Sequence, residues 1–476
     1  MTRRLMLKIA GEIGTKSSRT RRRFLRILAG NVRAALAHAA LPGTVESRWS
    51  RLFVETPDPD RARDVLSTVF GVHSISDVAV LRYRDLSDLV EQAAALYHDR
   101  VAGKTFAVRP RRSGDTGFSS RDVAVKLGDA LLSVSAGVNL DEPEVEVPIE
   151  VVDRKAYAIL ASTPGAKGLP LGSGHPAVAL FSGGFDSPVA AWMVMRRGTA
   201  LDLVVCDLDG CGGPDVALEV AHAMASRWAP GVEMRAHVVD LVPVVEALRR
   251  DVESRLRQVV LKRAMYRAAT LVAGEVGGEA VVTGEVLGQV STQTLRNLAV
   301  AEDAAGVPVL RPIIGMDKEE IIALARRLGT HDLSARVQEH CAIATGRVET
   351  GARLEEVVTA EGQVDETFIH TAVRRRRIVE LSTWSAGPRP GHVVEEVPAG
   401  AVVIDVREAD EGEDLGHRRL PFSRVDEWLP TLDRGAQYVF VCTYGIRSEL
   451  VARELVGRGY KALALAGGMA ALTHAA

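Results

Sequence analysis

The chain is poor in the features that mark secreted, metal-binding and membrane proteins. It has only four cysteines among 476 residues and no C-x-x-C pair. Cysteines so few and so scattered exclude a disulfide scaffold and give no sign of a zinc site. No uninterrupted apolar run approaches the roughly 20 residues that cross a bilayer, so the sequence predicts a protein without a membrane span. Its length predicts roughly three or four domains.

The net charge of the chain is also close to zero, yet the charged residues are unevenly distributed along it. The formal net charge is −2, but the first 26 residues carry nine Lys and Arg against the single acid Glu12. Such a composition occurs in transit peptides. Here, however, Leu5–Ile9 has the composition of a strand, and apolar residues then recur every four positions, as on the buried face of a helix: Phe24, Leu28, Val32 and Leu36. We therefore expect a folded N-terminus that faces nucleic acid, in a cytoplasmic protein.

The central stretch Ala177–Arg197 lacks both the G-x-x-x-x-G-K-[ST] and the G-x-G-x-x-G patterns. It nevertheless predicts a strand, a Gly-rich turn and a helix, with the turn reading Ser182-Gly183-Gly184-Phe185-Asp186-Ser187. Adjacent glycines let successive N–H groups point at one anion. Ser187 suits the N-cap, Pro188 suits the first helical position, and a helix start favours negative charge. The stretch predicts a phosphate or pyrophosphate cradle, and it resembles the SGGxDS loop of ATP pyrophosphatases.

The residues that follow predict alternating strands and helices. Strands are expected at Leu201–Asp207, Glu233–Leu241 and Glu279–Thr283, and helices at Val216–Trp228 and Leu256–Gly274. This alternation indicates a parallel sheet covered by helices on both faces. Ligands of such sheets bind beyond the carboxyl ends of the strands, where Ser182 and Gly284 would both lie.

Basic residues upstream of this region form two clusters on predicted loops and strand ends, where they suit contact with a phosphate backbone. The RNA-binding candidates are Lys16, Arg19, Arg23, Lys104, Arg109, Arg111 and Arg112. One cluster is usually a solvated surface, but two clusters ahead of a nucleotide loop favour RNA. The stretches EIGTKS and KTFAVRPRRSGDTGFSSRD resemble the N-terminal ferredoxin-like and THUMP domains of tRNA-modifying enzymes. That resemblance implies recognition of RNA by its shape.

Near the C-terminus, the predicted strand Tyr438–Val441 delivers Cys442 into the loop Thr443-Tyr444-Gly445-Ile446-Arg447-Ser448, and a helix follows. N–H groups at a helix start, together with Arg447, favour a thiolate or a persulfide carried on it. The loop resembles the rhodanese active-site loop, supported by Asp405-Val406-Arg407 and Leu465-Ala466-Gly467-Gly468-Met469. Cysteine phosphatases place the arginine one residue further from the cysteine, where this chain has Ser448, so sulfur carriage is favoured.

Taken in order, SGGFDSPVA, LKR, TGEVLGQVSTQTL and RPIIGMDKEEI behind a THUMP-like region resemble the tRNA 4-thiouridine synthetase (tRNA sulfurtransferase) family. With the residues of the turn, the resemblance implies an ATP site made by Leu180, Phe181, Ser182, Gly183, Gly184, Ser187, Lys262, Gly284 and Gln293. Asp186 would help to bind the Mg²⁺-complexed nucleotide. Cys341 would be a resolving cysteine that forms a transient disulfide with Cys442.

The implied fold is an α/β multidomain protein. Its parts would be a ferredoxin-like domain (1–57), a THUMP domain (58–164), a Rossmann-like parallel-sheet ATP pyrophosphatase domain (165–350), a helical connector (351–391) and a rhodanese-like α/β domain (392–476). The run Arg374–Arg377 in the connector is more typical of a solvated helix face than of an RNA contact.

The implied reaction is ATP-dependent transfer of sulfur to uridine 8 of tRNA, through adenylation of O4 and a Cys442 persulfide. The implied partners are tRNA, a cysteine desulfurase, an external reductant and the sulfur-carrier protein of thiamine thiazole synthesis. A homodimer would let one subunit's RNA-binding face serve the other's active site, but the sequence leaves the oligomeric state open. The rival hypotheses are an ATP pyrophosphatase acting on a small molecule and a non-enzymatic RNA-binding module. The roles of Cys206 and Cys211 stay open, as does the adenine pocket near Asp207-Leu208-Asp209.

Overall fold

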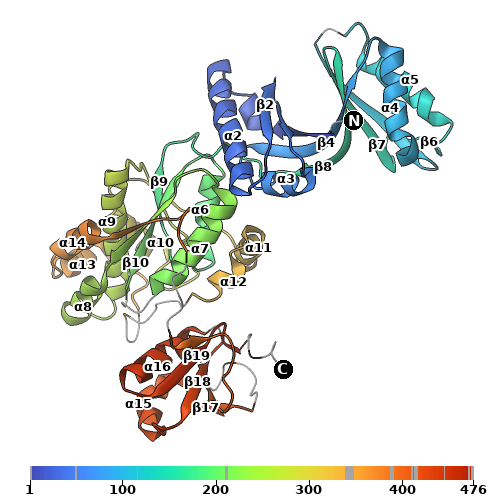
Figure 1. Ribbon diagram of the computed structural model, residues 1–476. Coiled ribbons are helices and arrows are strands. Elements are labelled where there is room, and N and C mark those ends of the chain that lie inside the picture. Colours follow the sequence, from blue (N-terminus) through green and yellow to red (C-terminus); the bar gives the residue numbers. More distant parts are fainter. Residues whose placement is uncertain are drawn as a thin grey trace. The chain divides into compact units, whose positions relative to one another are not determined.

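A computed structural model of the chain describes residues 3–48, 51–114, 116–208, 213–337, 343, 348–385, 391–408, 411, 416–443, 445–469 and 472. The chain forms two compact units. Unit 1 comprises Met1–His175, Met193–Ala200 and Arg227–Glu233, and unit 2 comprises the remainder. Mixed α/β structure runs through both units, as predicted, and Figure 1 labels the helices and strands. Within the described part, no helix is both long and apolar enough to cross a membrane.

Unit 1 is built on one eight-stranded sheet with the order β2-β3-β1-β4-β8-β7-β5-β6. The strands are β1 (Arg3–Ile9), β2 (Thr44–Arg48), β3 (Arg51–Glu55), β4 (Val72–Arg82), β5 (Thr105–Ser113), β6 (Gly137–Val138), β7 (Val145–Val152) and β8 (Lys155–Pro164). The helices are α1 (Gly11–Gly14), α2 (Ser18–His38), α3 (Pro59–Leu66), α4 (Leu86–Val101) and α5 (Ser120–Leu132). β4 pairs with β8 in a long antiparallel ladder. The two α/β units expected from the sequence therefore share a continuous sheet.

Each half of this sheet has its own helix-covered core. Phe24, Leu28, Val32 and Leu36 of α2 are buried in one core, as their four-residue spacing predicted. Leu89 and Ala93 of α4 and Leu127 of α5 belong to the other core. Apolar stripes at helical spacing bury themselves against a sheet, and this accounts for the two layers of each half.

The second basic cluster lies at both ends of β5, with Lys104 just before the strand and the arginines in its last part, which agrees with the predicted loops and strand ends. β5 continues past Val108 to Ser113, so Arg109, Arg111 and Arg112 lie on a strand. Pro110 lies within β5 although proline cannot donate to a sheet ladder. β5 accommodates it because β6 pairs only with Thr105 and Phe106, which leaves that side of β5 open at Pro110.

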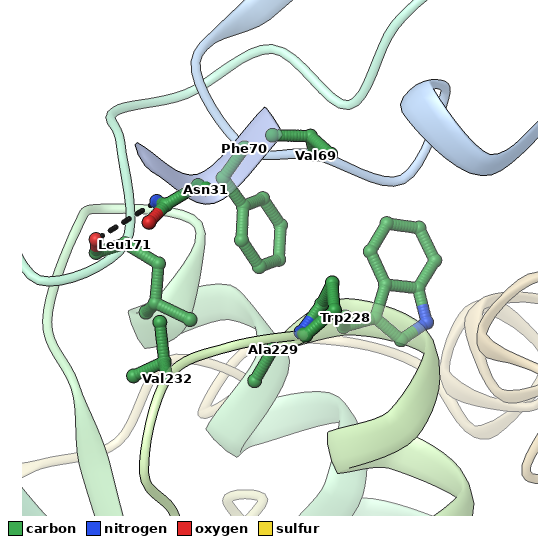
Figure 2. Close-up of a pocket in the computed structure, with 8 residues that line it drawn as sticks. Asn31, Val69, Phe70, Leu171, Trp228, Ala229 and Val232 are labelled. Atoms are coloured by element: carbon green, nitrogen blue, oxygen red, sulfur yellow. Dashed lines mark hydrogen bonds between the residues drawn. The ribbon is translucent and has the colours of Figure 1, made fainter. Parts of the chain in front are cut away.

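A small apolar cavity lies inside unit 1, where the segment Arg227–Glu233 packs (Figure 2). Its volume is about 10 Å³, room for about one water molecule. Phe70 and Trp228 stack there with ring centroids 5.6 Å apart, and Asn31 Nδ2 donates to the Leu171 carbonyl at 3.0 Å. The cavity is therefore a packing feature and too small for a substrate.

Unit 2 contains a six-stranded sheet with the order β13-β12-β9-β10-β11-β14. Its strands are β9 (Ala177–Leu180), β10 (Leu201–Asp207), β11 (Arg235–Asp240), β12 (Val281–Val282), β13 (Val309–Leu310) and β14 (Arg377–Glu380). The helices are α6 (Asp186–Met195), α7 (Gly213–Trp228), α8 (Val242–Asp251), α9 (Arg257–Val276), α10 (Leu295–Glu302), α11 (Lys318–Leu328), α12 (His331–Ser334), α13 (Leu354–Glu361) and α14 (Thr367–Arg375). The pairings from β13 through β11 are all parallel, which confirms the predicted parallel sheet.

The segment expected as a helical connector belongs instead to this central sheet. β14 pairs antiparallel with β11, and Ile369 and Val373 of α14 are buried in the same core as α9. Arg376 is not on a solvated helix face, because its side chain is only 8% exposed. Its Nε donates to His237 Nδ1 at 2.9 Å, and His237 lies in the middle of β11. Arg374, Arg375 and Arg377 are exposed, as the prediction of a solvated face requires, so Arg376 is the member of the run that departs from it.

The C-terminal part of unit 2 has a separate five-stranded sheet with the order β15-β19-β18-β16-β17. Its strands are β15 (Val393–Val394), β16 (Val402–Asp405), β17 (Arg418–Arg419), β18 (Gln437–Val441) and β19 (Lys461–Leu465), and their pairings are all parallel. Its principal helices are α15 (Val425–Trp428) and α16 (Ile446–Gly457). β18 lies at the centre of this sheet, which places Cys442 at the carboxyl end of a buried strand.

Candidate active site

The glycine-rich turn lies between β9 and α6, and its serines fold it back on itself. Ser187 Oγ accepts hydrogen bonds from the backbone N–H of Ser182 at 3.1 Å and of Gly183 at 3.2 Å. Successive N–H groups thus converge on one oxygen, but that oxygen belongs to the chain. The predicted N-cap role of Ser187 is wrong, because α6 already begins at Asp186 and Pro188 is its third residue. Ser187 instead closes the turn.

Two glycines allow close approaches that a side chain would prevent. Gly183 has a φ of +79°, and a Cβ there would lie 2.7 Å from Ala217 Cα on α7. A Cβ on Gly284, just after β12, would lie 2.7 Å from the Asp186 carbonyl carbon and from the Ser187 nitrogen. Both distances are too short for a real side chain, so these positions require glycine.

The contact between Gly284 and the turn occurs where the strand order reverses. From β9 the chain adds β10 and β11 on one side, then returns to add β12 and β13 on the other. Ligands of doubly wound sheets bind at such a switch point, beyond the carboxyl ends of the strands. The structure therefore brings Ser182 and Gly284 together at the edge that the sequence predicted.

Asp186 is held by two side chains that sequence reasoning did not select. Lys318 Nζ lies 2.9 Å from Asp186 Oδ1, and Gln289 Nε2 donates to Oδ2 at 3.0 Å. Lys318 also lies 5.5 Å from the centroid of the Phe185 ring. A signal for Lys318 was present, because a lysine in the first turn of a helix opposes the helix dipole. The predicted helix start at Asp317 is confirmed by a capping box with Glu320.

Lys262 meets a buried carboxylate, Glu285, beside Gly284. Lys262 Nζ lies 3.1 Å from Glu285 Oε1, and the guanidinium of Arg311 donates to Oε2 at 2.8 Å. Burial alone would raise the pKa of Glu285, but Lys262, Tyr266 and Arg311 outweigh it and hold that pKa at about 2. Glu285 is therefore ionised at neutral pH. Sequence reasoning missed Glu285 and Arg311, although both lie within the motifs it singled out.

Gln293, Leu180 and Phe181, three of the predicted ATP-site residues, are buried or partly buried. Gln293 is 7% exposed, and its Oε1 has no hydrogen-bond partner among the described residues. A buried amide oxygen without a partner is costly, so it fits a position that a ligand donor completes. Phe181 is buried, and Leu180 packs against the core that α9 covers.

Asp186 is a carboxylate of the turn itself, and it could bind Mg²⁺ that accompanies the nucleotide. Among the residues that the structure describes, no group of three His, Cys, Asp or Glu side chains could hold a metal ion. The donor set thus fits a cation that is held mainly by phosphate oxygens rather than by a protein cage.

Cys442 lies at the carboxyl end of β18 and is 3% exposed. Its Sγ accepts the backbone N–H of Gly445 at 3.2 Å and lies 3.6 Å from Ser448 Oγ. Gly468 packs against this loop, since a Cβ there would lie 2.1 Å from the Cys442 carbonyl oxygen. One backbone N–H of the predicted loop therefore meets the sulfur, and the Gly467–Gly468 turn packs against the loop.

The arginines near Cys442 have other partners. Arg407 and Arg419 both donate to the buried Asp405, so the Asp-x-Arg motif joins β16 to β17. Arg447 is ion-paired with Glu411. Among the described contacts, these arginines are thus paired with carboxylates rather than with the sulfur of Cys442.

The basic candidates of unit 1 differ in their availability. Arg109 donates to Glu146 and to the Leu140 carbonyl, and Arg112 donates to the Gly114 carbonyl, so both support local structure. The other five are exposed and have no ion pair among the described contacts: Lys16, Arg19, Arg23, Lys104 and Arg111.

The remaining cysteines do not extend the site. Cys341 and Cys211 lie outside the described residues. Cys206, at the end of β10, packs against the core, and burial raises the pKa of its thiol to about 12. A thiol in that state is a poor nucleophile.

Comparison with known proteins agrees with this architecture. Residues 172–365 match the family described as Thiamine biosynthesis protein (ThiI), residues 4–76 match the ThiI ferredoxin-like domain, and residues 83–160 match the THUMP domain. A crystal structure described as a 4-thiouridine synthetase–RNA complex with bound ATP superposes with a TM-score of 0.70 at 25% identity. It covers 80% of this chain and 99% of that chain.

Two curated relatives match nearly the whole chain. A tRNA sulfurtransferase of Desulfurococcus amylolyticus is 39% identical over 98% of this chain and 97% of that protein. A tRNA sulfurtransferase of Pectobacterium atrosepticum is 34% identical over 96% of this chain and 98% of that protein. The chain therefore belongs to the tRNA sulfurtransferase family of enzymes.

Proposed function

We propose that this enzyme transfers sulfur to uridine 8 of tRNA, giving 4-thiouridine, with ATP as the activating substrate. The observation that carries the proposal is the meeting of Gly284 with the Asp186–Ser187 backbone at the switch point of the central sheet. The proposal is supported by two lysines, because Lys318 contacts Asp186 of the turn and Lys262 contacts Glu285, the neighbour of Gly284. Family membership and the RNA- and ATP-bound structural relative support the choice of tRNA over a small molecule.

In the first step, uridine O4 attacks the α-phosphorus of ATP and pyrophosphate leaves. The predicted contacts are Leu180, Phe181, Ser182, Gly183, Gly184, Ser187, Lys262, Gly284 and Gln293. Lys262 and Lys318 offset phosphate charge, and the backbone of the turn orients the nucleotide. Asp186, released from Lys318, would bind the Mg²⁺ that accompanies the nucleotide. Adenylation makes O4 a good leaving group.

In the second step, Cys442 carries the sulfur. A cysteine desulfurase loads it as a persulfide, and the terminal sulfur attacks C4 of the activated uridine while AMP leaves. Cys341 then attacks the Cys442 sulfur, which breaks the S–S bond and leaves a Cys341–Cys442 disulfide and 4-thiouridine. An external reductant reopens the disulfide. The Gly445 N–H on Cys442 Sγ supports this role, because it stabilises negative charge on sulfur.

Two further roles are part of the proposal. The RNA backbone is bound by the exposed basic residues Lys16, Arg19, Arg23, Lys104 and Arg111. Cys442 also passes sulfur to the carrier protein of thiamine thiazole synthesis, which the family description as a thiamine biosynthesis protein supports.

Measurement of tRNA-dependent pyrophosphate release tests the central step. The purified chain with ATP should release pyrophosphate only when unmodified tRNA is present. Release with ATP alone would indicate an ATP pyrophosphatase that acts on another substrate. No release with or without tRNA would favour a non-enzymatic RNA-binding module.

A further inference from the structure

We propose that Glu285 is a positioning residue for ATP, with one carboxylate oxygen fixed by the fold and the other holding Lys262 at the nucleotide site. This inference rests on the proposed function, because it concerns how the same site is prepared for ATP. It assigns a role to a buried carboxylate that no step of the reaction uses.

The fixed oxygen is Oε2. It accepts hydrogen bonds from the Tyr266 hydroxyl at 2.6 Å, the Thr283 hydroxyl at 3.1 Å and Arg311 Nε at 2.8 Å. The three donors come from α9, from the residue after β12 and from the residue after β13. Glu285 itself is 3% exposed. Donors from three separate segments leave the carboxylate little freedom to rotate.

The second oxygen, Oε1, faces Lys262. Its described partner is the Lys262 ammonium at 3.1 Å. The contact is an ion pair without hydrogen-bond geometry, because Oε1 has no hydrogen-bond partner among the described residues, so it uses none of the three N–H donors of the ammonium. The Lys262 side chain is 28% exposed, in contrast to the buried Glu285. The ammonium of Lys262 is thus held by an ion pair with Glu285 and can still donate hydrogen bonds to an anion.

Arg311, unlike Lys262, has no guanidinium nitrogen left without a hydrogen-bond partner among the described residues. Its Nε binds Glu285, one terminal nitrogen binds Glu302 Oε2 at 2.6 Å and the other donates to the Tyr266 hydroxyl at 3.3 Å. Its donors are engaged on every side, so it serves as the counter-ion that makes burial of Glu285 tolerable. Lys262 is therefore the cation of this cluster that remains available to the nucleotide.

The position of Glu285 in the chain links this cluster to the turn. Gly284, its neighbour, touches the backbone of Asp186 and Ser187. A flexible lysine loses side-chain entropy when it binds phosphate. Glu285 removes part of that loss in advance, because it holds the ammonium beside the turn before ATP arrives.

The test compares ATP affinity of the full-length protein by titration calorimetry. Glu285→Gln keeps the size of the side chain but removes its charge, and the dissociation constant for ATP should rise about tenfold or more. Glu302→Gln is the matched control, because it removes the other carboxylate on Arg311 and does not contact Lys262; its ATP affinity should stay within twofold of wild type. In tRNA-dependent pyrophosphate release, Glu285→Gln should raise KM for ATP and leave kcat within threefold.

A double-mutant cycle separates positioning from general support of the fold. In a Lys262→Met background, Glu285→Gln should weaken ATP binding by less than twofold further. If Glu285→Gln does not fold, Glu285→Asp serves in its place, because it keeps the charge and withdraws it from Lys262. The inference is overturned if these Glu285 variants bind ATP as wild type does, or if their effect is undiminished without Lys262. Failure of the wild-type protein to bind ATP would overturn the proposed function itself.

Discussion

At the scale of single residues, Cys442 has the clearest chemical assignment. Its sulfur is buried, accepts one backbone N–H and lies within 3.6 Å of a hydroxyl. Cys206, by contrast, is a partly exposed thiol that packs against the core, and burial raises its pKa. We therefore propose Cys442 as the reactive cysteine of the two.

We expect Cys442→Ser to lose 4-thiouridine formation by at least a hundredfold while tRNA binding stays within twofold. The hydroxyl fits the same loop but cannot carry a persulfide. Thiolation is measured by nucleoside analysis of tRNA after incubation with ATP and a persulfide donor. Cys206→Ala is the control and should retain activity. Full thiolation by Cys442→Ser would remove Cys442 from the mechanism.

Gly284→Ala tests the close approach of the turn to β12. The added Cβ would lie 2.7 Å from two backbone atoms, so the turn must move away. We expect ATP affinity to fall at least tenfold, measured by calorimetry, with the circular dichroism spectrum retained. Gly274→Ala is the control, because a Cβ there meets no atom within 4 Å. In the helix interior that change should stabilise by about 1 kcal/mol. Unchanged ATP binding by Gly284→Ala would contradict the close approach.

At the scale of elements, local pattern predicted strands and helices well where burial followed a simple rule. β10 has the bounds that its apolar run predicted. β4 and β8 were not predicted, because polar residues such as Ser76 and Asp77 interrupt the apolar pattern, and only pairing with distant strands buries them. Pairing between strands that are far apart in the chain cannot be predicted from a short stretch of sequence.

The same limit applies to the candidate site. The turn and Gly284 could be predicted, because glycine and serine patterns carry their own geometry. Asp186–Lys318 and Lys262–Glu285 could not, because each pair joins residues far apart in the chain. Ser187 was assigned to a cap because serine caps many helices, but its hydroxyl binds the N–H groups of the turn instead.

β14 depends on Arg376, which connects it to the middle of the sheet. Arg376 Nε donates to His237 Nδ1, so the proton of His237 is on Nε2 and faces Asp202. Arg376→Ala leaves these buried groups incompletely paired and should cost about 2 kcal/mol of unfolding free energy. Urea denaturation measures it. Arg375→Ala, which removes an exposed neighbour, should change stability by less than about 0.5 kcal/mol. Equal losses in both variants would argue against the buried network.

At the scale of the whole molecule, the N-terminal charge should decide how tRNA binding responds to salt. Each phosphate contact releases about one counter-ion, so Arg19→Ala with Arg23→Ala should lower the slope of log affinity against log salt by up to about two. Filter binding at several salt concentrations measures the slope. Arg453→Ala with Arg458→Ala removes the same charge from α16 and the residue that follows it, and should leave the slope unchanged. The same loss of slope from both pairs would contradict a localised RNA-binding face.

We propose that one chain combines basic residues for tRNA, a switch-point turn for ATP and a buried cysteine for sulfur. The most direct test is nucleoside analysis of unmodified tRNA incubated with the full-length protein, ATP and a persulfide donor. The account predicts 4-thiouridine at position 8, pyrophosphate released in equal amount, and neither product when ATP is omitted. Sulfur incorporation without ATP, or pyrophosphate release without tRNA, would contradict it.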